Sequence, residues 1–334
     1  MAEFPQSGRR EQGNELPMDV SIVYVNWNSA DYIAESIRSV YEHTRGIQFE
    51  IIVVDNASPA GNVDVLKEQF PEITLIKSAT NLGFAGANNL GYKSCSGENI
   101  LFLNPDTKLV SPAINAMLRH LRSLPNAGII GCKLLNSDLS VQTSCIQTFP
   151  TILNQVLDVD FLRRRWPKNS LWGIGPLYSD STEPAKVEVV SGACLMIKRA
   201  AFEKVSLFSD DYFMYAEDLD LCYKVVQAGF SNYYTGEGTI IHYGGKSSEP
   251  QSATMMKWRA IPRFCDKSRG RFYGFIFRIV MALTAMGRLA IIKIASVFGN
   301  TFAPKTDLNS ALAKWRTILS ILLTQNPRRA ETQA

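Results

Sequence analysis

The sequence is poor in the residues that build metal clusters and disulfide frameworks. It holds six cysteines and three histidines among 334 residues, and no two cysteines form a C-x-x-C pair. This spacing disfavours a zinc site and indicates reduced, mostly buried thiols, as in a cytosolic protein. The first 18 residues also lack an apolar core, so they do not resemble a signal peptide, and we expect a disordered leader there.

Internal repeats, low-complexity tracts and the G-x-G-x-x-G spacing of a dinucleotide site are also missing. Apolar residues make up 46% of the chain and charged residues 20%, which excludes a disordered chain, a collagen and a coiled coil. A chain of this length forms one large domain or two fused domains and can bury a large core.

Charge is distributed unevenly along the chain. The formal net charge is +4, yet residues 253–334 hold 14 basic and 3 acidic residues, a balance of +11, while residues 1–252 have a balance of −7. An acidic body with a basic tail indicates that the tail meets an anionic partner.

Hydrophobic patterning predicts alternating strands and helices in the first 123 residues. Short apolar runs, typical of buried parallel strands, occupy residues 20–24, 50–54, 74–76 and 99–103. Helices are predicted at residues 30–43, 63–70, 81–91 and 112–123. This order is typical of an open parallel sheet, in which ligands bind beyond the carboxyl ends of the strands.

The second half of the chain is less regular. Strands are predicted at residues 187–190, 194–197 and 239–241, and helices at residues 200–205 and 218–228. The last strand leads into His242, which Gly244 and Gly245 follow, and glycines let a backbone approach a ligand closely. A lone histidine is more often structural, and only the neighbouring motifs favour a functional role for this one.

Two aspartates, Asp55 and Asp106, stand just beyond predicted strand ends. Asp106, in the string L-N-P-D-T, has the position of a carboxylate that binds a hard divalent cation bridging phosphates. A helix N-cap or a turn aspartate would explain either residue alone equally well. In the segment 81–91, Gly83 and Gly86 would allow a nucleotide or phosphate to approach, although this pattern alone is a weak indication.

A further group of acidic residues opens the helix predicted from residue 218. Glu217, Asp218 and Asp220 stand within four positions, and acidic residues at a helix start stabilise its dipole. That explanation covers Asp220 well but leaves the aromatic-rich approach at residues 211–215 unexplained. Carboxylates crowded beside aromatic side chains can have raised pKa values and suit a general base.

Six strings occur in an order that resembles the family 2 glycosyltransferases. They are S-I-V-Y-V-N-W-N, V-V-D-N-A-S, N-L-G-F-A-G-A-N-N, L-N-P-D-T, M-Y-A-E-D-L-D-L-C and I-I-H-Y-G-G-K-S. The resemblance extends over residues 19–250 and is strongest to bacterial rhamnosyltransferase-like enzymes. It implies an α/β fold of the GT-A type, with a Rossmann-like, mostly parallel sheet and flanking helices. It also implies a nucleotide-sugar donor, a divalent metal (Mg²⁺ or Mn²⁺) and inversion at the anomeric carbon.

The same resemblance implies roles for residues of this sequence. Asp218 would be the catalytic base, with Glu217 beside it, and Asp106 and His242 would bind the metal. Asn104 stands at the first acidic position of the family's D-x-D-type motif, which leaves Asp106 as the one certain carboxylate ligand. The substrate-binding residues implied are Asn26, Asn28, Asp55 (on the nucleotide base or ribose), Asn81, Gly83, Gly86, Asn88, Lys246 and Ser247.

Residues 272–298 form a strongly apolar segment with a few basic residues. On a helical wheel, at about 100° per residue, the basic residues fall within about 140° of one another and apolar residues fill the other side. The basic residues are Arg271, Arg278, Arg288 and Lys293, and the apolar side comprises Phe277, Ile279, Val280, Leu283, Ile291, Ile294 and Phe298. No 18-residue stretch is free of charge, so the pattern predicts an interfacial amphipathic helix on an anionic leaflet and not a spanning one. A helix packed on the catalytic domain is the alternative, and nucleic acid is not an expected partner.

We therefore expect a cytoplasmic glycosyltransferase that associates peripherally with the inner face of the cell membrane. The expected donor is dTDP-rhamnose, which supplies L-rhamnose, with a UDP-linked sugar as the alternative. The expected acceptor is a glycan or a polyprenyl-linked saccharide of a cell-surface polysaccharide.

The expected domains are a leader at residues 1–18, a catalytic domain at 19–265 and a basic helical membrane-associating tail at 266–334. Within the catalytic domain, residues 19–130 form the nucleotide-sugar half and residues 131–265 the acceptor half. Two competing interpretations are a nucleotidyltransferase or oxidoreductase on the same sheet, and an inactive sugar-nucleotide-binding protein. The joint presence of Asp106, Asp218 and His242 disfavours the inactive protein.

Overall fold

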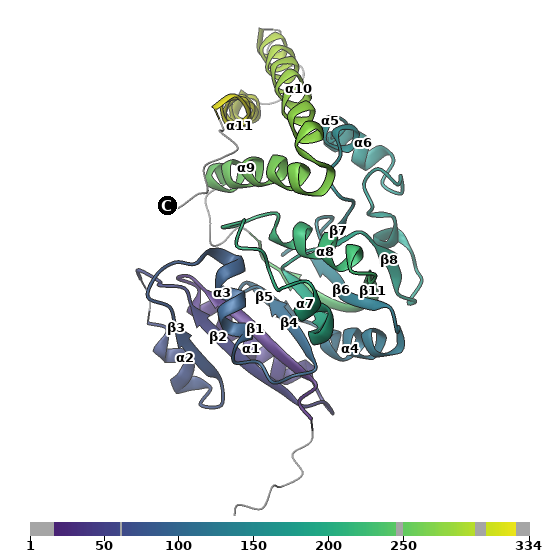
Figure 1. The fold of residues 1–334 in the computed structure, drawn as a ribbon. Coiled ribbons are helices and arrows are strands. Elements are labelled where there is room, and N and C mark those ends of the chain that lie inside the picture. Colours follow the sequence, from purple (N-terminus) through teal and green to yellow (C-terminus); the bar gives the residue numbers. More distant parts are fainter. Residues whose placement is uncertain (1–16, 61, 245–249, 298–304, 325–334) are drawn as a thin grey trace, which may run out of the picture.

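The computed structural model describes residues 17–60, 62–244, 250–297 and 305–324, and its centre is a nine-stranded sheet flanked by helices (Figure 1). The strands of this sheet are β1 (Val20–Asn26), β2 (Phe49–Asp55), β3 (Thr74–Lys77), β4 (Asn99–Leu103), β5 (Thr107–Leu109), β6 (Ala127–Leu135), β8 (Ala185–Val187), β10 (Cys194–Lys198) and β11 (Ser231–His242). A smaller sheet pairs β7 (Ile146–Gln147) with β9 (Val189–Val190). Most of the leader predicted at residues 1–18 lies outside the described residues.

The helices alternate with the strands in the first half and gather at the end of the chain. They are α1 (Ala30–His43), α2 (Asp64–Gln69), α3 (Gly83–Tyr92), α4 (Ala113–Ser123), α5 (Ile152–Val156), α6 (Asp160–Arg165), the short 3-10 helix η1 (Gly175–Tyr178), α7 (Arg199–Lys204), α8 (Glu217–Gln227), α9 (Pro250–Arg269), α10 (Arg271–Val297) and α11 (Lys305–Thr324).

The parallel half of the sheet confirms the predicted β-α order. Strands β3, β2, β1 and β4 lie side by side in that order, and all three pairs are parallel. The apolar runs of β1, β2 and β4 are buried, as expected for strands covered by helices, whereas β3 at the edge of the sheet is partly exposed. Asn26 stands opposite Asp55 in the register, so polar residues from two strands end at the same edge.

The other half of the sheet is mixed. Strand β10 runs antiparallel between β4 and β6, β6 and β11 are parallel, and β5 pairs antiparallel with the end of β11. Neither β6 nor the first part of β11 was predicted from the sequence. The fold is nevertheless mostly parallel α/β, as expected.

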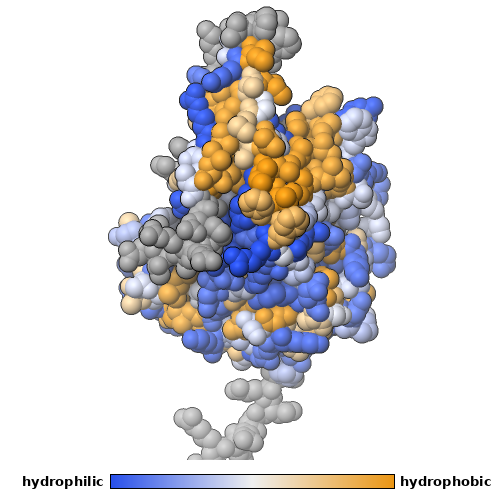
Figure 2. All heavy atoms as spheres, turned by 45° about the horizontal axis from the view of Figure 1, so that its top comes forward, coloured by the Kyte–Doolittle hydropathy of each residue, from blue (hydrophilic) through white to orange (hydrophobic). Residues whose placement is uncertain are grey.

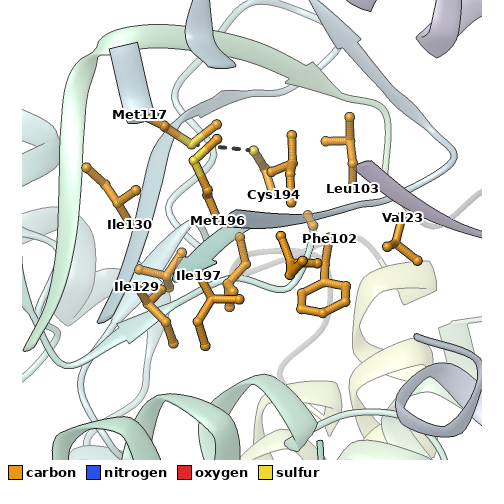
Figure 3. Close-up of a cluster of buried hydrophobic side chains, with 14 of the residues drawn as sticks. Val23, Phe102, Leu103, Met117, Ile129, Ile130, Cys194, Met196 and Ile197 are labelled. Carbon is orange, nitrogen blue, oxygen red and sulfur yellow. Dashed lines mark hydrogen bonds between the residues drawn. The ribbon is translucent and has the colours of Figure 1, made fainter. Parts of the chain in front are cut away.

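The two halves share one hydrophobic core around β4 and β10 (Figure 3). Phe102 of β4 packs against Phe202 and Phe208, with ring centroids 5.2 and 4.8 Å apart. On the other side, Cys194 of β10 meets Met117 of α4, with the two sulfur atoms 4.0 Å apart. The six cysteines are free thiols and five are buried, which confirms the prediction of reduced, mostly buried thiols.

Helices α9, α10 and α11 form a second hydrophobic cluster of their own. Helix α9 also joins the main core, because Phe264 stacks on Phe149 with centroids 5.9 Å apart. Residue 265 lies inside α9, so the expected boundary between catalytic domain and tail falls within a continuous helix. Helix α10 is long and apolar enough, by length and composition, to cross a membrane over Arg271–Ser296.

The orientation of α10 differs from the helical-wheel prediction. Phe277 is fully buried, whereas Arg278 and Arg288 turn toward the protein. Arg278 pairs with Asp266, and the Nη2 atom of Arg288 donates a hydrogen bond of 2.8 Å to the carbonyl oxygen of Val156. The predicted exposed basic face is therefore wrong at these two arginines, because acceptors inside the molecule satisfy them.

Candidate active site

Asp106 and His242 come together at one edge of the sheet. Asp106 lies in the connection between β4 and β5, and His242 ends β11, where it pairs with Thr107. The Nε2 atom of His242 lies 3.3 Å from Oδ1 of Asp106, which is only 8% exposed. On the other side of the ring, Nδ1 lies 2.8 Å from Oε1 of Gln142. Because an amide oxygen only accepts, Nδ1 carries a proton, and a neutral ring turns its Nε2 lone pair toward Asp106.

This pair fits a divalent cation. An imidazole whose second nitrogen is held by a hydrogen bond is the usual arrangement of a metal-binding histidine. Among the residues that the structure describes, no cluster of three or more His, Cys, Asp and Glu side chains is arranged to hold a metal. Asp106 and His242 would therefore supply two ligands, and phosphate oxygens and water would supply the rest, as is common for Mg²⁺.

Neither predicted strand-end aspartate caps a helix. The N-cap residues of α2 and α4 are Val63 and Pro112, so the N-cap explanation is wrong for both Asp55 and Asp106. Asp55 is instead the last residue of β2, and Asp106 lies in a turn after β4, as the turn explanation predicts for it; both are at the sheet edge where this class of fold binds its ligands.

Asp218 lies in the first turn of α8, at a fixed position. The helix begins after two non-glycine residues in the left-handed region, Tyr215 and Ala216, with φ of 70° and 66°. Such backbone strain persists only where the surrounding structure holds it, and it clusters at functional sites. Oδ2 of Asp218 accepts a hydrogen bond from the Gly192 N–H at 3.1 Å, and Oδ1 accepts one from the Leu219 N–H at 2.8 Å.

The turn at residues 191–193 connects Asp218 to the loop that carries Asp106. Gly192 donates its N–H to Asp218, and the next carbonyl, that of Ala193, accepts the Asn104 N–H at 3.0 Å. Asn104 is only two residues before Asp106, and its Nδ2 lies 3.4 Å from Nε2 of His242. One short turn therefore holds both carboxylate-bearing segments.

Burial raises the pKa values of both carboxyls at the start of α8. It raises the pKa of Glu217 to about 8, and the neighbouring charge of Asp218 adds to the effect. Burial also raises the pKa of Asp218, but hydrogen bonds from Gly192 and Leu219 and the positive charge of Lys257 oppose that rise. Oε2 of Glu217 has no hydrogen-bond partner. At neutral pH we therefore assign the proton to Glu217 and the negative charge to Asp218.

Asp55 and Asn26 face one another at the ends of β2 and β1. Nδ2 of Asn26 donates to Oδ1 of Asp55 at 2.7 Å and to the Ser58 hydroxyl at 3.1 Å. Asn28, with φ of 55°, accepts the Ala60 N–H on its Oδ1 at 3.0 Å. These contacts fix two loops that border the carboxyl edge of the sheet, where a nucleotide would bind.

Asn56, one residue beyond β2, holds the predicted Gly-rich segment in place. Its Nδ2 donates to Oδ1 of Asn81 at 2.9 Å. Gly83 has φ of +69°, and a Cβ atom there would lie 2.2 Å from the carbonyl oxygen of Phe213, so only glycine fits. The same carbonyl accepts the Phe84 N–H at 2.8 Å. The Gly-rich segment thus packs directly on the loop that leads to α8.

The remaining predicted substrate contacts have a less direct position. Asn88 is buried within α3, and its side chain donates to the carbonyl oxygen of Phe84 at 3.0 Å. Gly86 lies in the same helix. Lys246 and Ser247 fall outside the described residues. Their roles in substrate binding stay predictions.

A buried ion network fixes α8 to α9. Asp220 is fully buried, and its Oδ1 lies 2.8 Å from Nζ of Lys267. The Ser209 hydroxyl donates to the same carboxylate at 2.5 Å, and Arg263 pairs with Asp211 at 2.9 Å. The helix-dipole explanation of Asp220 therefore omits its main partner, a lysine 47 positions further along the chain.

Sequence reasoning missed three residues that position the site. Gln142 holds His242, Gly192 holds Asp218, and Asn56 holds the Gly-rich segment. Asn56 belongs to the string V-V-D-N-A-S and could have been found there, because it directly follows Asp55. Gln142 and Gly192 give no such signal, since each acts on a partner distant in sequence.

The sequence matches the model of one protein family, described as glycosyl transferase family 2, over residues 21–206. The chain is 29% identical over 211 residues to the N-acetylglucosaminyl-diphospho-decaprenol L-rhamnosyltransferase of Mycobacterium tuberculosis, a match that covers 59% of this chain and 67% of the relative. It is 24% identical over 264 residues to the rhamnosyltransferase WbbL of Escherichia coli K12, covering 75% of this chain and 94% of the relative.

Among solved structures, the fold is similar to the mannosyltransferase PcManGT from Pyrobaculum calidifontis in complex with GDP-Man and Mn²⁺. The TM-score is 0.60 at 14% identity, and the match covers 94% of this chain and 91% of the other. It is also similar to GalNAc-T7 with UDP, GalNAc and Mn²⁺, with a TM-score of 0.57 at 14% identity, over 79% of this chain and 51% of the other. These similarities show a GT-A fold.

The Lys267 contact predicts a measurable loss of stability. Lys267→Met leaves the buried carboxylate of Asp220 without its closest cation, and we expect the free energy of unfolding to fall by about 2 kcal/mol, the scale for an unsatisfied charged group. Lys93→Met, at an exposed position after α3, is the control and should change it by less than about 0.5 kcal/mol. Equal effects of the two substitutions in urea unfolding would contradict the role of Lys267.

The raised pKa of Glu217 predicts a pH-dependent effect of its replacement. The folded carboxyl keeps its proton up to about pH 8, whereas the unfolded one releases it near 4.5, so the free energy of unfolding falls as the pH rises between these values. Glu217→Gln cannot ionise and should gain stability over the wild type as the pH is raised from 5 to 8, as measured by thermal unfolding. Glu68→Gln, exposed on α2, is the control. A stability difference between Glu217→Gln and the wild type that is the same at every pH would refute the assignment of the proton to Glu217.

Proposed function

The chain belongs to glycosyl transferase family 2, and on that premise we propose that it transfers L-rhamnose from dTDP-rhamnose, with inversion, to a polyprenyl-linked saccharide or glycan of a cell-surface polysaccharide. The relatives from M. tuberculosis and E. coli are named as rhamnosyltransferases, which supports rhamnose as the sugar. The name of the M. tuberculosis relative also supports a polyprenyl-diphosphate-linked acceptor. A UDP-linked donor is the alternative that the first experiment distinguishes.

The observation that carries this proposal is the shared turn at residues 191–193. Its backbone binds Asp218 on one side and the Asn104–Asp106 loop on the other. The proposed general base and the proposed diphosphate-binding loop are thereby attached to one short connection. This supports inverting transfer, in which the base and the diphosphate site must be held at fixed positions around the anomeric carbon.

Asp218 has the features of the base. Two backbone N–H groups fix its carboxylate, and burial raises its pKa, which makes it a better proton acceptor near neutral pH. In the reaction the acceptor oxygen forms a bond to the anomeric carbon while its proton passes to Asp218. The bond from the anomeric carbon to the diphosphate oxygen breaks, and the electron pair leaves with the nucleoside diphosphate.

Asp106 and His242 would hold the divalent cation that the GT-A neighbours contain as Mn²⁺. When bound, a divalent cation neutralises the charge that develops on the departing diphosphate. Gln142 keeps the His242 ring in the orientation that turns Nε2 toward Asp106. Asp55 and Asn26 would contact the nucleoside, as their place at the same sheet edge supports.

We also place the protein at the cytoplasmic face of the membrane, where a polyprenyl-linked acceptor would be presented. The apolar helix α10 and the basic balance of residues 253–334 support this location. The division into a catalytic part and a membrane-associating tail belongs to the same proposal, although α9 is continuous across residue 265.

A donor comparison tests this function, and Asp218→Asn tests its base. Nucleoside diphosphate release is measured with dTDP-rhamnose, UDP-glucose, UDP-N-acetylglucosamine and GDP-mannose, each with Mn²⁺ or Mg²⁺. We expect the fastest release from dTDP-rhamnose.

Asp218→Asn should lower kcat at least about 100-fold with donor binding nearly unchanged, because the amide cannot accept the proton.

The control for this variant is Asp210→Asn, an exposed aspartate in the loop before α8, which should keep wild-type turnover. Turnover of Asp218→Asn within a few-fold of the wild type would remove Asp218 as base and direct attention to Glu217. Absence of binding and release with every donor would refute the proposed function itself.

The assignment of Asp106 and His242 as metal ligands predicts losses of metal-dependent activity that differ in size among the variants. Asp106→Asn and His242→Gln should abolish Mn²⁺-stimulated turnover, and Gln142→Ala should raise the Mn²⁺ concentration needed for half-maximal activity by about tenfold, the usual effect of losing a residue that orients a ligand. His120→Gln, on α4 and bonded to Glu237, is the control histidine. Full activity of Asp106→Asn in the presence of EDTA would contradict a metal at this site.

A further inference from the structure

Helix α10 presents one continuous apolar face to the solvent. Seven large apolar side chains, 43% to 79% exposed, recur at intervals that place them on one side of the helix: Phe272, Phe275, Ile279, Leu283, Met286, Ile291 and Ile294. The helix has 27 residues and is therefore about 40 Å long. Figure 2 shows the hydrophobic residues gathered on this part of the surface. An apolar patch of this length on a soluble monomer marks an interaction surface. We call it the α10 stripe.

The opposite side of α10 is occupied by the protein itself. Phe277, Met281 and Ala285 are fully buried in the cluster formed with α9 and α11. Trp315 of α11 covers the guanidinium of Arg288, which lies 4.4 Å from the ring centre. With this packing, one side of α10 is apolar and exposed to solvent. The other side packs against α9 and α11, which carry many charged residues. That arrangement suits a helix lying along an interface and not one crossing a bilayer.

A second apolar region, from the catalytic half of the chain, is fixed beside the α10 stripe. The Tyr273 hydroxyl accepts the Ile152 N–H at 3.0 Å, and Arg288 donates to the carbonyl oxygen of Val156 at 2.8 Å, so α5 is attached to α10. Figure 1 shows α5 and α6 next to α10. Three apolar side chains in and around these two short helices are exposed: Leu153 by 57%, Phe161 by 69% and Trp166 by 51%. We call these three residues the α5–α6 corner.

Basic side chains lie next to the aromatic residues of the α5–α6 corner. Arg164 and Arg165 are exposed, and Arg165 lies 5.4 Å from the ring centre of Trp166. Tryptophan and arginine together are typical of the level of lipid headgroups, because the ring enters the acyl boundary while the guanidinium stays at the phosphates.

We propose that the α10 stripe and the α5–α6 corner form a single surface that docks on an anionic lipid bilayer, with α10 lying in the membrane plane. The catalytic half thus contributes its own anchor, Phe161 and Trp166, in addition to the helical tail. Apolar side chains of both regions enter the headgroup boundary, and Arg164 and Arg165 meet lipid phosphates. A bilayer fits better than a second copy of this chain, because the copy would bring the same basic residues together.

In this docked orientation, helix α9 connects the membrane-facing helix α10 to α8, which carries the proposed base Asp218. Helix α9 lies between α10 and α8, and Lys257 of α9 is close enough to Asp218 to affect its pKa (Figure 1). The α10 stripe therefore belongs to the helical unit that packs beside the proposed base, and a polyprenyl-linked saccharide held at the docked surface would be presented on that side of the molecule. This use of the surface rests on the proposed acceptor, whereas the docking itself rests on the exposed residues.

The test is flotation of the full-length protein with vesicles of phosphatidylcholine, alone or mixed with phosphatidylglycerol. The corner variant is Phe161→Ser with Trp166→Ser, and the stripe variant is Phe275→Ser with Leu283→Ser. Each should bind mixed vesicles at least about tenfold more weakly than the wild type, because buried apolar area is lost. Val110→Ser, 40% exposed before α4, is the control and should bind as the wild type does.

A charge variant separates the electrostatic attraction to anionic lipid from the burial of apolar side chains. Arg164→Gln with Arg165→Gln should weaken binding to mixed vesicles several-fold and leave binding to pure phosphatidylcholine unchanged. Circular dichroism and release of nucleoside diphosphate from the donor verify that each variant is folded and active. Light scattering without lipid reports the oligomeric state.

Three results would overturn the proposal. The first is that the wild type does not float with mixed vesicles. The second is that the corner variant binds these vesicles as well as the wild type does. The third is a wild-type dimer that the stripe and corner variants dissociate, which would make this surface a contact between copies. Donor turnover separates these failures from that of the proposed function, since an active enzyme that does not float refutes the surface alone.

Discussion

Two backbone hydrogen bonds around Gly192 are the constraint on which the site depends. The Gly192 N–H fixes Asp218, and the neighbouring Ala193 carbonyl fixes Asn104, two residues before Asp106. These backbone groups lie at the start of β10, the strand that joins the parallel and mixed halves of the sheet. The distance between the proposed base and the proposed diphosphate site is therefore set by the rigid centre of the fold and not by flexible side chains.

A second constraint connects this site to the C-terminal helices. The buried carboxylate of Asp220, two residues after Asp218, is neutralised by Lys267 of α9. Because α9 also packs on α10, α8, the helix that carries the proposed base, is held by the same helical unit that presents the proposed membrane surface. Catalysis and membrane docking would then share one mechanical support, although each rests on separate residues.

The parallel half of the fold could be predicted because buried β-branched runs alternate there with amphipathic helices. Strand β6 could not, since Gly128 and Gly131 interrupt its pattern as turn residues would. In the structure these glycines allow close packing, because a Cβ atom would lie 2.6 Å from Val225 at the first and 2.3 Å from Val190 at the second. The helical wheel of α10 failed for a related reason, as contacts from distant segments determine where its arginines point.

The meeting of Asp106 and His242 at one edge of the sheet could be predicted from the sequence, but the contacts that position the candidate residues could not. Asp106 and His242 follow strand ends, and a strand-end rule brings them to one edge. Gln142 orients His242 from 100 positions away, which no local pattern reveals. The central claim, a single displacement with Asp218 as base, is tested most directly by the anomeric configuration of the transfer product, determined by NMR and compared with that of the donor. The account predicts inversion, and a product that retains the donor's configuration would contradict it.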